Sequence, residues 1–558
     1  MSTFLRYFSC SGKDRILSTY RRYSKQNFKP FYESLFEHSQ NVAVYDTHGA
    51  YKYNDILSAS YLIAQKIKKI LPAQSGERVS FLCTSDATYV SVFLACWITG
   101  NAAVPLCPSH PAAMLEYYVE NSESKLVIAN EKYIDPMQNI ATKLKSSFLC
   151  VDRDVFASTS SVSKSDLLKS EFFSWDSSFQ NKRALIIYTS GTTGRPKGVV
   201  LTHGNLFSQI SAVVKSWEID SKDSILLSLP LHHIHGIMNG FLCPLRSGGT
   251  LVMQPKFDAP EAWKYFLNLD STKPRVNLFF AVPTMYAKLL QEYNNSGYNE
   301  SSSRDKCLKT MRLMSSGSSS LPVPVFQRWE SITGHTLLER FGMSEIGMAT
   351  SNPLRGLRMP GSVGNPLPEV EVKIVKPGEA SESSDLVIGN DKEVKIQPGC
   401  EGKSGELMIR GPNVFNEYYN RPEATAESFT KDGWFQTGDT ACYEKGGFKI
   451  LGRTSVDIIK SGGYKISALE VESCLLRHPD IKECTVLGID DDVWGERVAA
   501  VLMFNEGKHI ANDELRAWCK SYIAGYAVPT VIKNVKEIPR NVMGKVNKKE
   551  LRKVFDSL

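Results

Sequence analysis

Short apolar runs alternate with amphipathic stretches from about residue 28 to residue 450. Runs such as ERVSFLC at 77–83, ALIIYTS at 184–190 and SILLSLP at 224–230 read as strands because they are rich in aliphatic and β-branched residues. Their alternation with helical stretches predicts an α/β fold with parallel sheets covered by helices. Residues 90–106 are apolar but are interrupted at 99–101, which predicts a buried helix leading into a strand and no transmembrane segment.

After about Val363 the strands become shorter and are separated by turns, which predicts a more antiparallel, barrel-like subdomain. The polar residues 377–403 are expected to form a loop between two of its strands. A domain boundary is predicted between Gly452 and Arg453, because the residues beyond it again mix strands and helices and suffice for a small α+β domain. We therefore expect an N-terminal domain at 24–452, with two parallel-type sheet subdomains plus the small barrel, and a C-terminal domain at 453–558.

The first residues are basic, rich in serine and poor in acids. Arg6, Lys13, Arg15 and the pair at 21–22 accompany Asp14, the one acid in residues 1–23. This composition is typical of a mitochondrial transit peptide. We expect cleavage after residue 23 and a mature protein in the mitochondrial matrix, with the frayed basic terminus of a cytosolic protein as the alternative.

The overall composition limits the classes of function. A net charge of +7 in 558 residues is too small to indicate nucleic-acid binding. The twelve cysteines are scattered without a CxxC pair, so free thiols are expected, with neither disulfides nor a structural zinc. Composition by itself gives no indication of an obligate protein partner.

The sharpest local feature is YTSGTTGRPKG at 188–198, directly after an apolar strand. Its glycines permit tight turns, its backbone amides and hydroxyls can surround phosphate oxygens, and Lys197 supplies positive charge. The segment differs from the GxxxxGK[ST] P-loop because no serine or threonine follows the lysine. It predicts a phosphate-binding loop.

This loop resembles the signature of the adenylate-forming superfamily, which includes the acyl-CoA synthetases. Further stretches match the family's motifs in the family's order, and the resemblance covers essentially everything after residue 30. They are SSGSSSLP at 315–322, ERFGMSEIG at 339–347, GELMIRGPNVFNEYY at 405–419, DGWFQTGD at 432–439, GRTSVDIIKSGGYKISALEVE at 452–472 and the residues 539–545. The resemblance implies ATP, Mg²⁺ and CoA, and a reaction that passes through an acyl-adenylate.

The resemblance also implies roles for individual residues. Lys197, Ser344, Glu345 and Lys545 would be catalytic, with Glu345 as the Mg²⁺ ligand. Phe341 would stack on adenine. The expected nucleotide-binding residues are Thr189, Ser190, Gly191, Thr192, Thr193, Gly194, Lys197, Gly317, Ser318, Ser319, Phe341, Gly342, Met343, Ser344, Asp439 and Arg453.

In this family the small C-terminal domain rotates between the two reaction steps as a mobile lid. Lys545 would serve adenylation, and Gly462, Gly463 and Tyr464 would line the CoA channel during thioester formation. The segment 452–460 is one residue longer than in many relatives. The hinge residue therefore stays open among Ser455, Val456 and Asp457.

The acyl pocket is expected to involve His233, Ile234, His235, Arg340 and Met348. An arginine at a pocket floor is costly unless an anion balances it, so Arg340 with His235 points to a substrate with a second carboxylate. The alternative is that Glu339 or Glu345 neutralises Arg340.

Several stretches, including LPLHHIHG at 229–236 and MATSNPLRGLRMPGSVGNPL at 348–367, resemble malonyl-CoA synthetases, which activate malonate and often methylmalonate. Arg355 and Arg358 are further candidates for binding the second carboxylate. An acyl-CoA synthetase for a medium-chain or aromatic monocarboxylic acid and a non-catalytic nucleotide-binding pseudoenzyme are the alternatives.

Overall fold

The computed structural model describes residues 30–170, 178–189, 195–376, 385–462, 464–540 and 546–555. The predicted transit peptide, loop residues Ser190 to Gly194, Gly463 and Lys545 lie outside the described residues. The helices are α2 Phe31–Glu37, α3 Tyr53–Lys68, α4 Ala87–Ile98, α5 Ala112–Asn121, α6 Ile134–Leu144, α7 Lys164–Lys169, α8 His203–Trp217, α9 Cys243–Arg246, α10 Ala259–Phe266, α11 Pro283–Asn295, α12 Glu300–Thr310, α13 Val323–Thr333, α14 Pro422–Glu427, α15 Ala468–Leu475, α16 Asn512–Lys520 and α17 Lys548–Arg552.

One sheet has the strand order β20-β8-β7-β4-β3-β5-β6. Its strands from β7 to β6 run parallel, whereas β8 and β20 are added antiparallel at one edge. The predicted buried helix is α4, which is buried over its whole length and leads into β4. The strands are β3 Arg78–Leu82, β4 Ala102–Pro105, β5 Leu126–Ala129, β6 Ser147–Cys150, β7 Arg183–Thr189, β8 Lys197–Thr202 and β20 Glu417–Tyr418.

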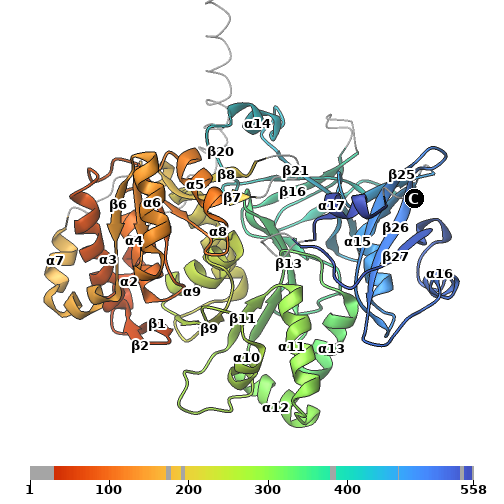
Figure 1. The fold of residues 1–558 in the computed structure, drawn as a ribbon, viewed down its shortest axis with the longest axis horizontal. Coiled ribbons are helices and arrows are strands. Elements are labelled where there is room, and N and C mark those ends of the chain that lie inside the picture. Colours follow the sequence, from red (N-terminus) through yellow and green to blue (C-terminus); the bar gives the residue numbers. More distant parts are fainter. Residues whose placement is uncertain are drawn as a thin grey trace, which may run out of the picture.

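A second sheet has the order β15-β14-β13-β12-β11-β9-β10-β1-β2 and is parallel from β13 to β1. Antiparallel strands β14, β15 and β2 complete its two edges. Figure 1 shows α10–α13 together at the lower centre of the molecule. The strands are β1 Val42–Asp46, β2 Gly49–Lys52, β9 Ser224–Leu227, β10 Thr250–Met253, β11 Leu278–Ala281, β12 Leu313–Ser316, β13 Leu338–Met343, β14 Gly347–Ser351 and β15 Asn365–Pro366.

The third sheet is antiparallel throughout, with the order β18-β17-β16-β19-β21-β22. It confirms the predicted change to short antiparallel strands. The prediction that 377–403 is a polar loop is wrong where β17 and β18 lie, because Leu386 and Val387 are buried and pair with β16. The strands are β16 Glu371–Val375, β17 Asp385–Gly389, β18 Val394–Ile396, β19 Gly405–Arg410, β21 Phe435–Glu444 and β22 Gly447–Arg453.

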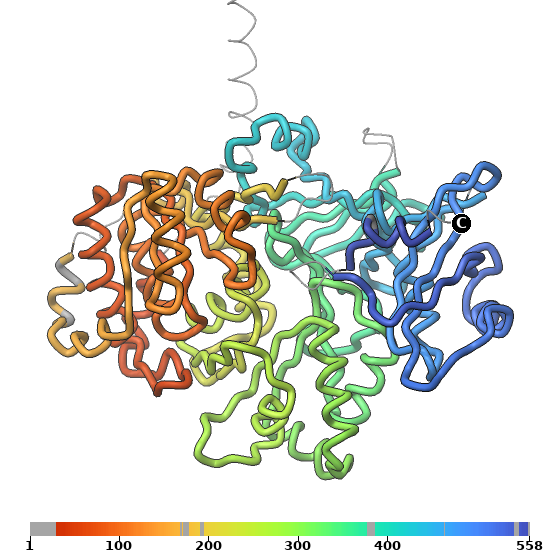
Figure 2. Tube along the Cα trace, viewed as in Figure 1, coloured from red at the N-terminus to blue at the C-terminus, as the bar shows by residue number. Residues whose placement is uncertain are grey.

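The C-terminal residues form a separate sheet with the order β24-β23-β26-β25, to which β27 adds on β26. Its apolar core packs α15 and α16 against β25 and β26. Figures 1 and 2 show this unit at the end of the molecule opposite α2–α7. The strands are β23 Ile458–Ser461, β24 Tyr464–Ser467, β25 Ile481–Asp491, β26 Gly495–Phe504 and β27 Val531–Asn534.

The C-terminal unit contacts the body of the molecule beside β22. Lys449 Nζ lies 2.6 Å from Glu470 Oε1, and the Ser467 hydroxyl donates to the Leu451 carbonyl at 2.5 Å.

No helix in the described part of the chain combines the length and the apolar character that a membrane crossing requires.

Candidate functional site

The phosphate-loop segment is carried by a hairpin of β7 and β8, in which Thr189 pairs with Lys197. Helix α5 holds both arms of this hairpin. The Tyr117 hydroxyl donates to the Pro196 carbonyl at 2.8 Å, and the Tyr188 hydroxyl donates to Asn121 Oδ1 at 2.9 Å. These bonds tie Tyr188 and Pro196, on either side of the loop motif, to α5.

The Lys197 side chain is joined to Glu345 through an aromatic ring. Lys197 Nζ lies 4.6 Å from the centre of the Tyr418 ring, and the Tyr418 hydroxyl donates to Glu345 Oε1 at 2.9 Å. Burial and the neighbouring Glu345 carboxylate raise the pKa of Tyr418, so the hydroxyl stays protonated and acts as a donor. Sequence reasoning assigned no role to Tyr418, although it lies in the quoted motif NVFNEYY.

Glu345 belongs to the turn between β13 and β14, together with the half-buried Ser344. The Phe415 backbone N–H donates to the Glu345 carbonyl at 2.7 Å, which ties this turn to the segment that precedes β20. Gly342 is required by a close approach, since a Cβ there would lie 2.0 Å from the Gly347 carbonyl oxygen. The Glu345 carboxylate, which Tyr418 links to Lys197, is the type of oxygen ligand that Mg²⁺ prefers.

Asp439 and Arg453 are opposite each other on β21 and β22. Arg453 Nε lies 3.1 Å from Asp439 Oδ1, and Arg453 also donates to the Thr437 carbonyl at 2.5 Å. Asp439 is buried, whereas the Arg453 side chain is partly exposed. The structure therefore brings these two predicted nucleotide-binding residues into direct contact.

The Arg340 guanidinium is buried and forms no ion pair with any residue that the structure describes. The residue is 5% exposed, and its Nε and Nη2 have no hydrogen-bond partner among the described residues. Burial lowers the pKa of Arg340 to about 9. A buried cation without an anion is unfavourable by several kcal/mol, so the site favours an anionic guest.

His235 and Gly317 lie beside this guanidinium: Gly317 directly follows β12, and His235 begins the π-helical segment His235–Leu242. A Cβ on Gly317 would lie 2.5 Å from Arg340 Cζ, so the guanidinium packs directly against the glycine backbone. Ser318 has φ +70° and its hydroxyl lies 3.1 Å from His235 Nδ1. Such a backbone conformation is rare outside glycine and is often found at functional sites.

His235 is also buried, and its Nε2 has no partner among the described residues. Burial, then the Arg340 and His233 charges, lower its pKa, so the imidazole is neutral at pH 7. A neutral imidazole can offer one more hydrogen bond here, in addition to the one that joins it to Ser318. Arg340 and His235 thus have unsatisfied polar atoms in one buried place.

The alternative partners of Arg340 are used elsewhere. Glu339 accepts a hydrogen bond from the Gly361 N–H at 2.7 Å, and Glu345 accepts from Tyr418. The suggestion that either carboxylate neutralises Arg340 is therefore wrong.

Two other predicted arginine candidates are also corrected. Arg355 is 78% exposed and pairs with Glu218 at the surface. Arg358 donates to the backbone carbonyls of Pro353, Thr336 and Leu354. Both guanidinium groups thus already have partners within the protein, in contrast to Arg340.

The remaining predicted acyl-site residues lie close by in the sequence and the fold. His233 and Ile234 precede the π-helical segment His235–Leu242, and Met348 is buried on β14 opposite Gly342. His233 packs against His232 with 4.2 Å between ring centres. Phe341 is half-buried on β13, next to Arg340.

The described members of the predicted CoA set lie on the C-terminal sheet. Gly462 has φ +56° and donates its N–H to the Trp494 carbonyl at 2.9 Å. Tyr464 is 52% exposed and stacks on Tyr526 with 4.0 Å between ring centres. This side of the C-terminal unit therefore presents an exposed aromatic surface.

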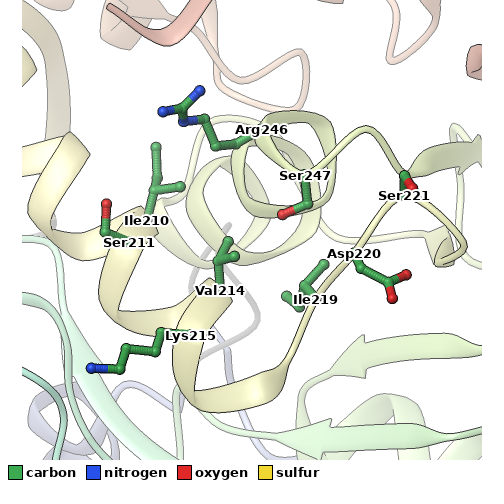
Figure 3. Close-up of a pocket in the computed structure, with 9 residues that line it drawn as sticks. All are labelled: Ile210, Ser211, Val214, Lys215, Ile219, Asp220, Ser221, Arg246 and Ser247. Carbon is green, nitrogen blue, oxygen red and sulfur yellow. The ribbon is translucent and has the colours of Figure 1, made fainter. Parts of the chain in front are cut away.

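A hollow of about 510 Å³ lies elsewhere, on the face formed by α8 and α9. Figure 3 shows that the charged ends of Arg246, Lys215 and Asp220 point in different directions. Ligand sites have convergent polar groups, and this hollow lacks them among the residues that line it. It is not part of the site.

The amino-acid sequence matches family models and known proteins over most of its length. Residues 31–419 match the model of the AMP-binding enzyme family, and residues 470–545 match the AMP-binding enzyme C-terminal domain. The mitochondrial malonate–CoA ligase ACSF3 of Homo sapiens is 45% identical over 537 residues, which are 94% of this chain and 92% of that protein.

Solved structures give the same result. ATP-bound MatB from Rhodopseudomonas palustris matches with a TM-score of 0.80 and 28% identity, over 94% of this chain and 98% of that one. A malonyl-CoA ligase with methylmalonyl-CoA and AMP bound matches with a TM-score of 0.61 and 32% identity, over 90% and 97%. The predicted fold class and superfamily are confirmed, and the chain belongs to the AMP-binding enzyme family.

Proposed function

We propose that this protein is an ATP-dependent malonyl-CoA synthetase of the mitochondrial matrix that also accepts methylmalonate. The observation that carries the proposal is the buried Arg340 guanidinium, which lies beside His235 and has unsatisfied N–H groups. The relatives named as malonate–CoA ligases support the same substrate class.

The reaction has two steps on one site. A carboxylate oxygen of the acid attacks the α-phosphorus of ATP, and pyrophosphate leaves. The CoA thiolate then attacks the acyl carbon, and AMP leaves with the electron pair of the broken bond. The sum is malonate, ATP and CoA giving malonyl-CoA, AMP and pyrophosphate.

Positioning and charge neutralisation dominate such a reaction, because two anions must be brought together. Lys197 and the segment from Thr189 to Gly194 are assigned to the outer phosphates, and Ser344 to the α-phosphate. Asp439, supported by Arg453, is assigned to the ribose hydroxyls. When bound to Glu345, Mg²⁺ would offset the negative charge of the phosphates. Lys545 is assigned to the charge that develops during adenylation.

The second carboxylate of the substrate is assigned to Arg340 and His235. The anion would restore an ion pair to a guanidinium that burial destabilises, and it would accept hydrogen bonds from Nε and Nη2. His233, Ile234 and Met348 would bound the small acyl group. An acid with one carboxylate leaves Arg340 unpaired, which makes the pocket selective for diacids.

The division into domains at 24–452 and 453–558 is retained, with rotation about the residues 455–457 between the two steps. Gly462, Gly463 and Tyr464 are then assigned to the CoA channel of the second pose. The stacked and exposed Tyr464 supports an aromatic surface for the nucleotide part of CoA.

The test of the substrate is AMP and pyrophosphate formation by the full chain with ATP, Mg²⁺ and CoA. The acids are malonate, methylmalonate, acetate, octanoate and benzoate, and the variants are Arg340→Met and the matched surface control Arg355→Met. We expect Arg340→Met to lose about a hundredfold in kcat/KM for malonate while retaining acetate turnover. Arg355→Met is expected to behave as wild type.

If the wild-type protein prefers octanoate or benzoate, its substrate is a monocarboxylic acid and the malonate assignment is wrong. Failure to release pyrophosphate with any acid would support the non-catalytic alternative. If Arg340→Met and Arg355→Met change kcat/KM for malonate equally, Arg340 does not select the substrate.

The test of the compartment is import of the full chain into isolated mitochondria, followed by protease protection after selective opening of the outer membrane. Protected protein whose N-terminus is Ser24 is the expected result. Protein that remains outside and uncleaved would place the enzyme in the cytosol.

A further inference from the structure

Lys548 is a nearly buried cation held between two carboxylates. It lies on α17, and its Nζ is 2.7 Å from Asp457 Oδ1 and 2.9 Å from Glu472 Oε1. Its side chain is 12% exposed. Burial opposes the charged amine, but the two carboxylates outweigh burial and raise its pKa, so the group stays a cation.

The two carboxylates have different structural connections. Glu472 on α15 also accepts hydrogen bonds from the Val486 N–H at 2.8 Å and the Thr485 hydroxyl at 3.2 Å. Glu472 therefore ties Lys548 to the interior of the C-terminal unit, within which α15 packs on β25. This arm of the cluster stabilises the fold.

Asp457 instead lies in the connector between β22 and β23, outside both strands. Its Oδ2 accepts the Arg453 N–H at 3.0 Å. Gly452 has φ +127°, and a Cβ at that position would lie 2.5 Å from Asp457 Cβ. The connector backbone is thus folded tightly around this one carboxylate.

The path continues to the nucleotide site, because Arg453 Nε lies 3.1 Å from Asp439 Oδ1. Lys548, Asp457, Arg453 and Asp439 form one series of contacts from the C-terminal helix to the carboxylate assigned to ribose. Figure 1 shows α17 beside α15 in the C-terminal unit, although Asp439 belongs to β21 of the body. Two of these contacts are ion pairs, and the middle one is the hydrogen bond from the Arg453 backbone N–H to Asp457. A contiguous network of ion pairs and hydrogen bonds can couple two parts of a molecule.

We propose that Lys548 is a positioning residue of the nucleotide site, which acts through Asp457 to hold Arg453 and Asp439 in the geometry that binds AMP. Docking of the C-terminal unit then raises nucleotide affinity, although Lys548 itself touches no nucleotide. The inference rests on the proposed function only in its assignment of Asp439 to the nucleotide.

The test measures binding of AMP with no acid or CoA present, by isothermal titration calorimetry on the full chain. We expect Lys548→Met and Asp457→Asn each to raise the Kd for AMP about tenfold. Asparagine keeps an acceptor for the Arg453 N–H but loses the ion pair, so the second variant isolates the Lys548 contact. The double variant should be no weaker than either single variant, and Lys548→Arg should restore most of the affinity.

Two controls separate positioning from stability. Glu472→Gln removes the ion pair between Lys548 and Glu472, and it should lower Tm without changing the Kd for AMP. Lys508→Met removes an exposed lysine that lies 3.6 Å from Asp480 in the same unit, and it should leave both quantities unchanged. If Lys548→Met does not fold, Asp457→Asn carries the test.

The proposal is overturned if Lys548→Met and Asp457→Asn lower Tm but leave the Kd for AMP at the wild-type value. It is also overturned if Glu472→Gln weakens AMP binding as much as Asp457→Asn does. Wild-type protein that binds no AMP would overturn it together with the Asp439 assignment. Failure to activate malonate leaves this readout unaffected, so the two proposals fail separately.

Discussion

The Tyr418 hydroxyl lies 2.9 Å from Glu345 Oε1, and the same tyrosine ring lies 4.6 Å from Lys197 Nζ. A single side chain thus links the lysine assigned to the phosphates with the carboxylate assigned to Mg²⁺. The link joins β20 to the turn after β13, and these segments belong to different sheets.

Tyr418→Phe is expected to lower the rate of pyrophosphate release about tenfold without changing Tm. The ring that contacts Lys197 remains, but Glu345 loses a hydrogen bond to a charged group, which contributes roughly 1.5–3 kcal/mol. Stopped-flow pyrophosphate detection measures the effect. The control is Tyr419→Phe, whose hydroxyl donates to Glu123 at 2.9 Å; equal rates in both variants would contradict a role for Tyr418.

Tyr117→Phe is expected to raise the KM for ATP about fivefold, because it removes the hydrogen bond that holds Pro196 at the stem of the phosphate loop. The phenyl ring keeps its contact with Arg195, whose guanidinium lies 5.5 Å from the ring centre. Initial rates at saturating malonate and CoA test this expectation. Tyr133→Phe, in the short helical turn that follows β5, serves as the control, and an equal rise in the KM for ATP in both variants would refute the anchoring role.

Gly317→Ala is expected to lower the malonate-to-acetate selectivity at least about tenfold, since the new methyl group would displace the Arg340 guanidinium. A selectivity ratio is used because any change in ATP binding affects both acids equally. Gly525→Ala is the matched control, as no atom lies within 4 Å of its added Cβ. Unaltered selectivity would show that Arg340 can move without loss of function.

Glu339→Gln is expected to flatten the pH dependence of stability. Burial raises the pKa of Glu339 from 4.5 to about 8, opposed in part by the hydrogen bond from Gly361. Between pH 4.5 and about pH 8 the folded protein holds a proton that the unfolded chain has released. The free energy of unfolding of the wild type therefore falls as pH rises through this range, by about 1 kcal/mol per pH unit.

Glutamine mimics the protonated carboxyl, so the variant should lose this slope and exceed the wild type in stability above pH 8. Urea unfolding at pH 5.5, 7 and 8.5 measures the difference. The exposed Glu423→Gln serves as the control. Parallel pH curves for the wild type and Glu339→Gln would mean that Glu339 is ionised in the folded state.

Much of the fold was predictable because strands and phosphate loops have local signatures. The runs at 77–83, 184–190 and 224–230 became β3, β7 and β9 within a few residues. The strands β17 and β18 were missed because their polar flanks hide a short buried pair, Leu386 and Val387, whose partner strand is β16.

The candidate site was predicted unevenly. Asp439 and Arg453 could be paired from motifs, and the structure places them 3.1 Å apart. Tyr418 was overlooked, because its role depends on the hydrogen bond to Glu345, which is 73 residues away in the sequence. No local pattern records such a distant contact.

The sequence by itself determined the family and many of the strands, and it predicted a phosphate-binding loop, because these depend on neighbouring residues and on motif order. Only the tertiary structure showed which of the candidate arginines is buried with unpaired donors. All three arginines were candidates from the sequence, but Arg355 pairs with Glu218, 137 residues away, and Arg358 donates to backbone carbonyls. Arg340 is buried with unsatisfied donors, and burial and partnership are properties of the folded chain.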